Sequence, residues 1–158
     1  MIASVVSSVV NKDLIIVAVT KTTASVYAIG SRLLDKYRQR DGPYHTHNAA
    51  RVIHTLDITN RVKIVDAICS DLNAIGVQHS KSVSLALEQL HVALLDIEQQ
   101  LEQLDLKITT FQDIWFANWR GYVLHNDLEQ LQSAFSCLER RLNMLMTVVP
   151  IMQLSPHT

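Results

Sequence analysis

The sequence predicts an all-α protein, an antiparallel four-helix bundle with long heptad-patterned helices. Apolar residues recur at alternating steps of three and four along most of the chain, and its 4 glycines and 3 prolines fall mainly where that pattern breaks. Such spacing places the apolar side chains on one helix face, and it matches helices that cross at about 20°. In the third predicted helix leucine dominates the a positions of the heptad, where parallel two-stranded coiled coils favour Ile or Val. An antiparallel bundle is therefore preferred.

The first predicted helix runs from about Asp13 to Arg40. Asp13 is a suitable N-cap, and basic residues in the last turns suit the negative end of the helix dipole. Its stripe consists of Ile16, Val19, Thr23, Val26, Gly30, Leu33 and Tyr37. Residues 1–12 form an apolar arm in front of this helix, for which a strand and a frayed helix both remain open.

The second predicted helix runs from about Asp57 to Ile75, and Gly76 provides a natural stop. Its stripe consists of Ile58, Val62, Val65, Cys69 and Leu72, and Ile64, Ile68 and Ile75 widen it.

The third predicted helix begins near Ser80 or Ser82 and carries the most regular pattern. Its seam consists of Leu87, Leu90, Leu94, Ile97, Leu101, Leu104, Ile108, Phe111 and Trp115, with a second stripe of Leu85, Val92 and Leu95 in its first half. Its second half is narrower, and we expect that half to face solvent more. A capping box of Thr110 and Asp113 predicts a break near Thr110, followed by a short aromatic helix to about Trp119.

The fourth predicted helix begins at Asn126, an N-cap followed by Glu129 at the third helical position. Its seam consists of Leu128, Leu131, Phe135, Leu138, Leu142, Leu145 and Val149, and Pro150 is expected to end it. We therefore expect a single helical-bundle domain over residues 13–149, between the apolar arm and a C-terminal tail of residues 150–158.

The composition favours contact with another protein chain. Apolar residues make up 48% of the chain, while the charged fraction of 18% is below the typical quarter. The charged side chains are thus too few to cover the whole surface. We therefore expect part of the apolar surface to be buried in a homo-oligomer or against a protein partner. Binding of nucleic acid needs a basic surface, and the net charge of −1 indicates no general basic character.

The cysteines and the apolar runs bear on the compartment. Cys69 and Cys137 have no CxxC spacing and lie in apolar helical patterns, which favours reduced core thiols in an intracellular, reducing compartment. A single bridge between them stays open. Polar residues at 11–13 and at Lys21 interrupt the apolar runs near the start, so no membrane span is expected.

No motif for catalysis or metal binding stands out. Glu88 and His91 have the Glu-x-x-His spacing of di-iron bundles, but no second such pair exists, and both lie beside the seam. His45, His47 and His54 are interpreted as histidines of an exposed loop region. There is no nucleophile elbow and no glycine-rich phosphate loop. We therefore expect no catalytic residue, no cofactor, no metal site and no enzymatic activity.

The densest functional signal is aromatic. Phe111, Trp115, Phe116, Trp119 and Tyr122 fall within twelve residues. Only one face of a helix can enter the core, and large rings are favoured anchors at protein interfaces. The predicted partner-binding residues are Phe116, Trp119, Tyr122 and Trp115.

These observations favour a non-enzymatic structural or assembly protein that acts through protein–protein contacts. A small subunit of a large complex, such as a viral capsid assembled in the host cell, is one setting that suits it. Two alternatives are open. One is a metal- or ligand-binding bundle that uses Glu88, His91 and His125. The other is a peripheral membrane factor that uses the apolar N-terminus.

Overall fold

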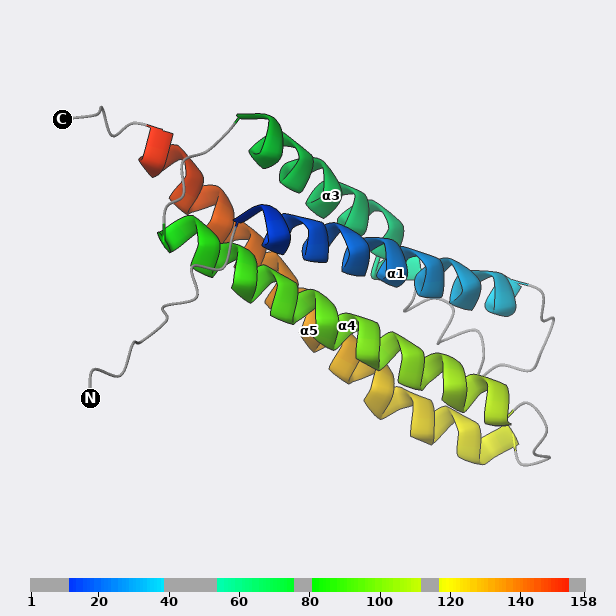
Figure 1. Ribbon diagram of the computed structural model, residues 1–158. Helices are drawn as coiled ribbons and strands as arrows, with labels where there is room; N and C mark the ends of the chain where they lie inside the picture. The colour runs from blue at the N-terminus through cyan, green and yellow to red at the C-terminus, as the bar shows by residue number, and fades with distance from the viewer. Residues whose placement is uncertain (1–11, 39–53, 76–80, 112–116, 154–158) are drawn as a thin grey trace, which may run out of the picture.

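The computed structural model describes residues 12–38, 54–75, 81–111 and 117–153. They contain four long helices, α1 (Lys12–Arg38), α3 (Ile58–Ile75), α4 (Lys81–Phe111) and α5 (Ala117–Gln153) (Figure 1). These described ranges contain no strand, and the all-α prediction is confirmed. The apolar arm of residues 1–12 lies almost wholly outside the described ranges, so the choice between a strand and a frayed helix is not tested.

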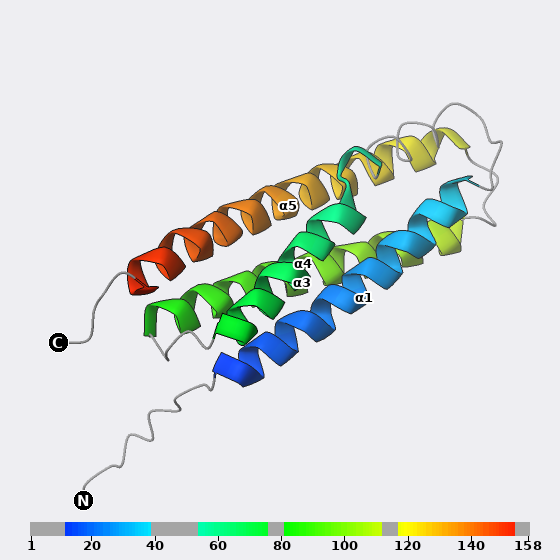
Figure 2. The same cartoon turned by 90° about the horizontal axis from the view of Figure 1, so that it is seen from above.

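The helices pack as two pairs joined mainly by one contact. α1 packs against α3, α4 packs against α5, and α1 packs against α4. Figures 1 and 2 show that α3 runs opposite to α1 and that α5 runs opposite to α4. α1 and α4 run in the same direction, because α3 has returned the chain to the end from which α1 began.

The α1–α4 pair has a constant register. Thr22 contacts His91 and Lys36 contacts Asp105, and each pair is separated by 69 residues in the sequence. A constant offset over this stretch requires parallel helices. When all neighbouring helices of a bundle are antiparallel, the first and third lie on a diagonal. Here the corresponding helices pack directly against each other, a contact that the sequence analysis did not anticipate.

The predicted seams form the core. Every seam residue whose side chain is described is buried, except Ile108, Leu142 and Val149, which are partly buried and pack against the core. The largest fully buried side chain is that of Phe135, and leucines of α4 and α5 make up much of the remainder. Burial of one such leucine stabilises the fold by roughly 2 kcal/mol.

Two features let α1 lie close to its neighbours. Thr22 and Thr23 are buried, and each hydroxyl donates a hydrogen bond to the backbone carbonyl four residues earlier, so neither leaves a donor unsatisfied. Gly30 faces α3. A Cβ atom at Gly30 would lie 3.0 Å from Cγ2 of Ile58, so glycine permits this close approach.

The start of α3 is set by Asp57, whose φ of 47° lies in the left-handed region. Aspartate adopts this region more readily than most residues. Its backbone carbonyl accepts a hydrogen bond from the amide of Arg61, and its carboxylate accepts one from the side-chain amide of Asn60. The predicted start near Asp57 is therefore close to the observed one.

The predicted bounds of the last helix were wrong. α5 begins at Ala117, continues through Gly121 and Asn126, and ends at Gln153, beyond Pro150. Glycine inside a helix costs only about 1 kcal/mol, and after Gly121 the side chains of Leu124 and Leu128 pack in or against the core. Pro150 lies in the last turns, where Val148 and Val149 still pack against the core. The expected tail of residues 150–158 is thus helical at its start.

Two surface assignments also need correction. Ile64 was expected to widen the buried stripe of α3, yet it is exposed. Leu85, Val92 and Leu95 in the first half of α4 are exposed too, although the second half was expected to face solvent more. Helix periodicity shows that residues share a face, but neighbouring helices decide whether that face is covered.

Two leucines of α4 provide a test of this core. Leu94 is fully buried, whereas Leu106 is 68% exposed on the same helix. Leu94→Asp places an unpaired charge in the core and is expected to destabilise the fold by more than about 4 kcal/mol. Leu106→Asp is expected to change stability by no more than about 0.5 kcal/mol. Urea unfolding followed by circular dichroism measures both, and equal losses would contradict the assigned core.

Candidate functional site

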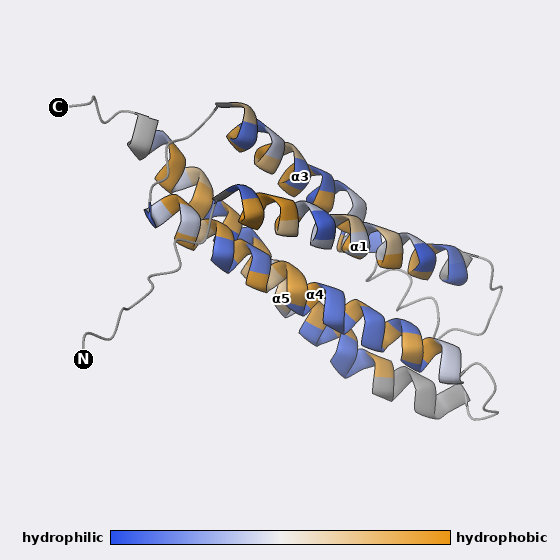
Figure 3. Cartoon of the chain, viewed as in Figure 1, coloured by the Kyte–Doolittle hydropathy of each residue, from blue (hydrophilic) through white to orange (hydrophobic). Residues whose placement is uncertain are grey.

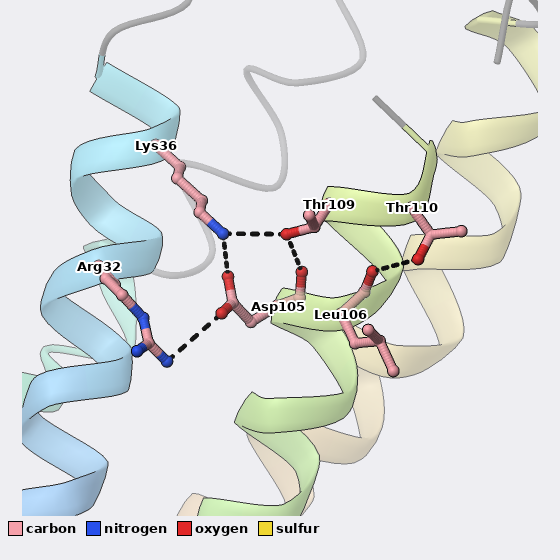
Figure 4. A network of polar contacts seen from close by, with 6 residues as sticks. All are labelled: Arg32, Lys36, Asp105, Leu106, Thr109 and Thr110. Atoms are coloured by element: carbon pink, nitrogen blue, oxygen red, sulfur yellow. Dashed lines mark hydrogen bonds and ion pairs between the residues drawn. The ribbon is translucent and has the colours of Figure 1, made fainter. Parts of the chain in front are cut away.

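The most connected polar cluster lies between α1 and α4 and is centred on Asp105 (Figure 4). Nζ of Lys36 donates to Oδ1 of Asp105 at 2.6 Å and to the hydroxyl of Thr109 at 3.0 Å. The guanidinium of Arg32 lies 3.4 Å from Oδ2 of Asp105. The Thr109 hydroxyl in turn donates to the backbone carbonyl of Asp105 at 2.8 Å.

This cluster is suited to fixing two helices rather than to catalysis. The Asp105 side chain is only 17% exposed, and both of its oxygens face basic groups of α1. Lys36 is itself occupied by two acceptors. Charge-assisted hydrogen bonds of this kind are stronger than neutral ones, and they favour one register of α4 along α1.

His91 makes the second polar contact between α1 and α4. Its Nε2 lies 3.1 Å from Oγ1 of Thr22. Because the Thr22 hydroxyl proton is donated to the carbonyl of Ala18, Thr22 accepts here and His91 donates from Nε2. The sequence interpretation placed Glu88 and His91 together beside the seam, exposed to solvent. The structure shows instead that both are half-buried and that His91 links two helices.

Two further ion pairs hold α5. Lys107 of α4 donates to both carboxylate oxygens of Asp127, at 2.7 and 2.9 Å. Arg61 of α3 pairs with Glu139 at 3.1 Å, and its guanidinium lies over the ring of Phe135, 5.5 Å from the centroid. Arg61 thus joins α3 to α5, two helices that otherwise approach each other little.

No set of metal ligands is found within the described ranges. No group of three or more His, Cys, Asp or Glu side chains there could hold a metal ion. His125 is exposed and lies 3.2 Å from Glu129, its neighbour one turn along α5. His45 and His47 lie outside the described residues.

Both cysteines are free thiols. Cys69 is buried, and burial, followed by the nearby charge of Asp66, raises its pKa to about 11. Because the thiolate is the reactive form, Cys69 is unsuited to nucleophilic chemistry at neutral pH. Its role is that of a small apolar side chain in the core.

The predicted partner-binding residues lie outside the described side chains. Trp115 and Phe116 lie outside the described residues, and Trp119 and Tyr122 lie in α5 without described side chains. The partner role of these rings therefore stays a prediction.

α4 carries exposed apolar residues on one of its faces, which we name the outer face of α4. It consists of Leu85, Val92, Leu95 and Leu106, whose side chains are 44–68% exposed. In Figure 3, hydrophobic and hydrophilic residues alternate along α4. The sequence analysis identified three of these residues but missed Leu106, because polar Gln99 interrupts the heptad spacing between Val92 and Leu106.

One helix is compatible with a membrane by length and composition alone. The 24 residues Asp13–Lys36 of α1 have a mean hydropathy of 1.4 over their most apolar window, of which 44% is buried in this structure. A core helix of a soluble protein meets the same criteria. The expectation that no membrane span exists stays a prediction.

Comparison of the chain with protein-family models, curated proteins and solved structures finds no match.

The Asp105 cluster can be tested against an exposed ion pair. Asp105→Ala leaves Lys36, which is 32% exposed, without its carboxylate, and we expect a loss of about 1–2 kcal/mol. The matched control is Glu129→Ala, which removes an exposed partner of His125 and should cost less than about 0.5 kcal/mol. Thermal and urea unfolding measure both. Equal effects would show that Asp105 does not fix the contact between α1 and α4.

Proposed function

We propose that this chain is a non-enzymatic helical structural or assembly protein that acts through contacts with other protein chains. In this proposal the four helices form a heptad-patterned bundle that presents side chains to a partner. The contacts Thr22–His91 and Lys36–Asp105 support heptad packing, since they lie 14 residues apart on each helix, which is two heptads.

The outer face of α4 is the observation that carries the proposal. Four large apolar side chains share one exposed face of a helix whose opposite face forms the core. Scattered exposed leucines need no explanation, but large apolar side chains gathered on one face of a helix, here over about six turns, are typical of a surface that meets another chain. The predicted aromatic residues, Phe116 first among them, would add a second contact.

The two alternatives have less support. A metal-binding bundle needs ligands that the described ranges do not bring together, and His91 already contacts Thr22. A peripheral membrane protein would use the apolar N-terminal arm, which lies almost wholly outside the described ranges, and it would gain little from the helix that follows. The apolar stripe of α1 already packs in the core, with Val19, Val26 and Leu33 fully buried. A reducing compartment is proposed on the free thiols of Cys69 and Cys137.

The proposal predicts that the purified chain is heavier than one copy, through self-association or through a co-purifying protein. Light scattering at several concentrations measures the mass, and mass spectrometry identifies what is bound. Phe116→Ala should weaken this association about tenfold or more with helix content unchanged. Gln132→Ala, at an exposed position of α5, is the control. A single chain at every concentration, with no bound protein, would contradict the proposal.

A further inference from the structure

α4 carries apolar residues on two opposite faces. Leu94 is fully buried, and Val92, about 200° away around the helix, is 59% exposed. Leu85, Val92 and Leu106 lie at multiples of seven residues, and Leu95 lies one turn from Val92. These side chains therefore form one stripe, about 30 Å long, opposite the core.

Neither neighbouring helix covers this stripe. α4 meets α1 through His91, Asp105 and Thr109, and it meets α5 through Lys107. On a helix these residues lie on the flanks of the core stripe. The outer face of α4 thus points away from both contacts, which agrees with the exposure of its four apolar side chains.

The stripe is bordered by acidic residues. Glu88 lies one turn from both Leu85 and Val92, Asp96 lies one turn after Val92, and Glu102 lies one turn before Leu106. None of the three forms an ion pair in the described part of the chain, where Asp96 accepts a hydrogen bond from Gln100. Lys81, at the start of α4, is the one basic residue along this face. Around the apolar stripe, acidic side chains of α4 therefore outnumber basic ones of the same helix.

This charge distribution decides between the possible occupants. Two copies of the chain packed through this face would bring the same three carboxylates against one another, which is unfavourable. A membrane with anionic lipids would repel them as well. A helix with one apolar face and basic flanks would satisfy both the stripe and the carboxylates.

We propose that the outer face of α4 docks a basic amphipathic helix of another protein. The inference rests on the proposed function and names the chemistry of the partner. Apolar residues of the docked helix would cover Leu85, Val92, Leu95 and Leu106. Its Lys or Arg side chains would pair with Glu88, Asp96 and Glu102, so binding weakens as salt screens these charges.

The test uses a fluorescent synthetic helix of about 20 residues, long enough to cover the stripe, with Leu at heptad core positions and Lys elsewhere. Fluorescence anisotropy measures its binding to the full chain at low and at raised salt. We expect the Lys peptide to bind, more weakly at raised salt, and a matched Glu peptide to bind at least about tenfold more weakly.

Two charge-reversal variants localise the binding. Glu88→Lys combined with Glu102→Lys should weaken binding of the Lys peptide about tenfold or more. Asp66→Lys combined with Asp71→Lys changes two exposed carboxylates of α3, gives the same net charge and should have little effect. Circular dichroism verifies that both variants are folded. Equal losses in the two variants would overturn the inference, because the peptide would then sense only net charge.

Other occupants give distinct results. A dimer of the wild-type chain that Val92→Asp dissolves would show that a second copy uses this face. Binding to phosphatidylserine vesicles that Val92→Asp abolishes would show a membrane there. Either result would overturn the inference. The effect of Phe116→Ala on association would still test the proposed function separately. Conversely, the peptide titration reports on α4 directly, whatever the mass of the purified chain.

Discussion

The contact between α1 and α4 is the one on which the remaining structure depends. α3 packs mainly on α1, and α5 packs mainly on α4, so this contact joins two helical pairs into one core. Leucines of α4 and the Val19, Val26 and Leu33 side chains of α1 are fully buried. Apolar burial holds the pairs together but tolerates sliding, whereas the polar contacts of Lys36 and His91 select one register.

This position of α4 leaves one of its faces without a neighbour. α1 and α5 occupy its two flanks, and the core occupies the face between them. A helix in this position needs only one apolar face for folding. The chain nevertheless places Leu85, Val92, Leu95 and Leu106 on the opposite one. Folding does not require this apolar stripe, and carboxylates border it. These two features link the architecture to the proposed docking of another helix.

Local pattern predicted the buried seams well, because periodicity reports directly which side chains share a helix face. It could not tell that Ile64 is exposed or that His91 reaches Thr22, since both depend on which helices become neighbours. The bounds of α5 were misjudged because Gly121, Asn126 and Pro150 are weak local signals beside the packing of the helix that contains them. For the aromatic partner site the density of rings was the only signal, and the described side chains do not include them.

The parallel packing of α1 and α4 can be measured with pairs of spin labels at exposed positions. Leu14, Leu85 and Leu106 are all exposed, and Leu106 lies about 30 Å beyond Leu85 along α4. Pulsed electron paramagnetic resonance measures the distance between the two labels of each pair. The labelled variants also carry Cys137→Ser, so that the remaining native cysteine, Cys69, is buried. We predict that labels at 14 and 85 lie much closer together than labels at 14 and 106. A shorter distance for 14 and 106 would contradict the parallel contact on which this account depends.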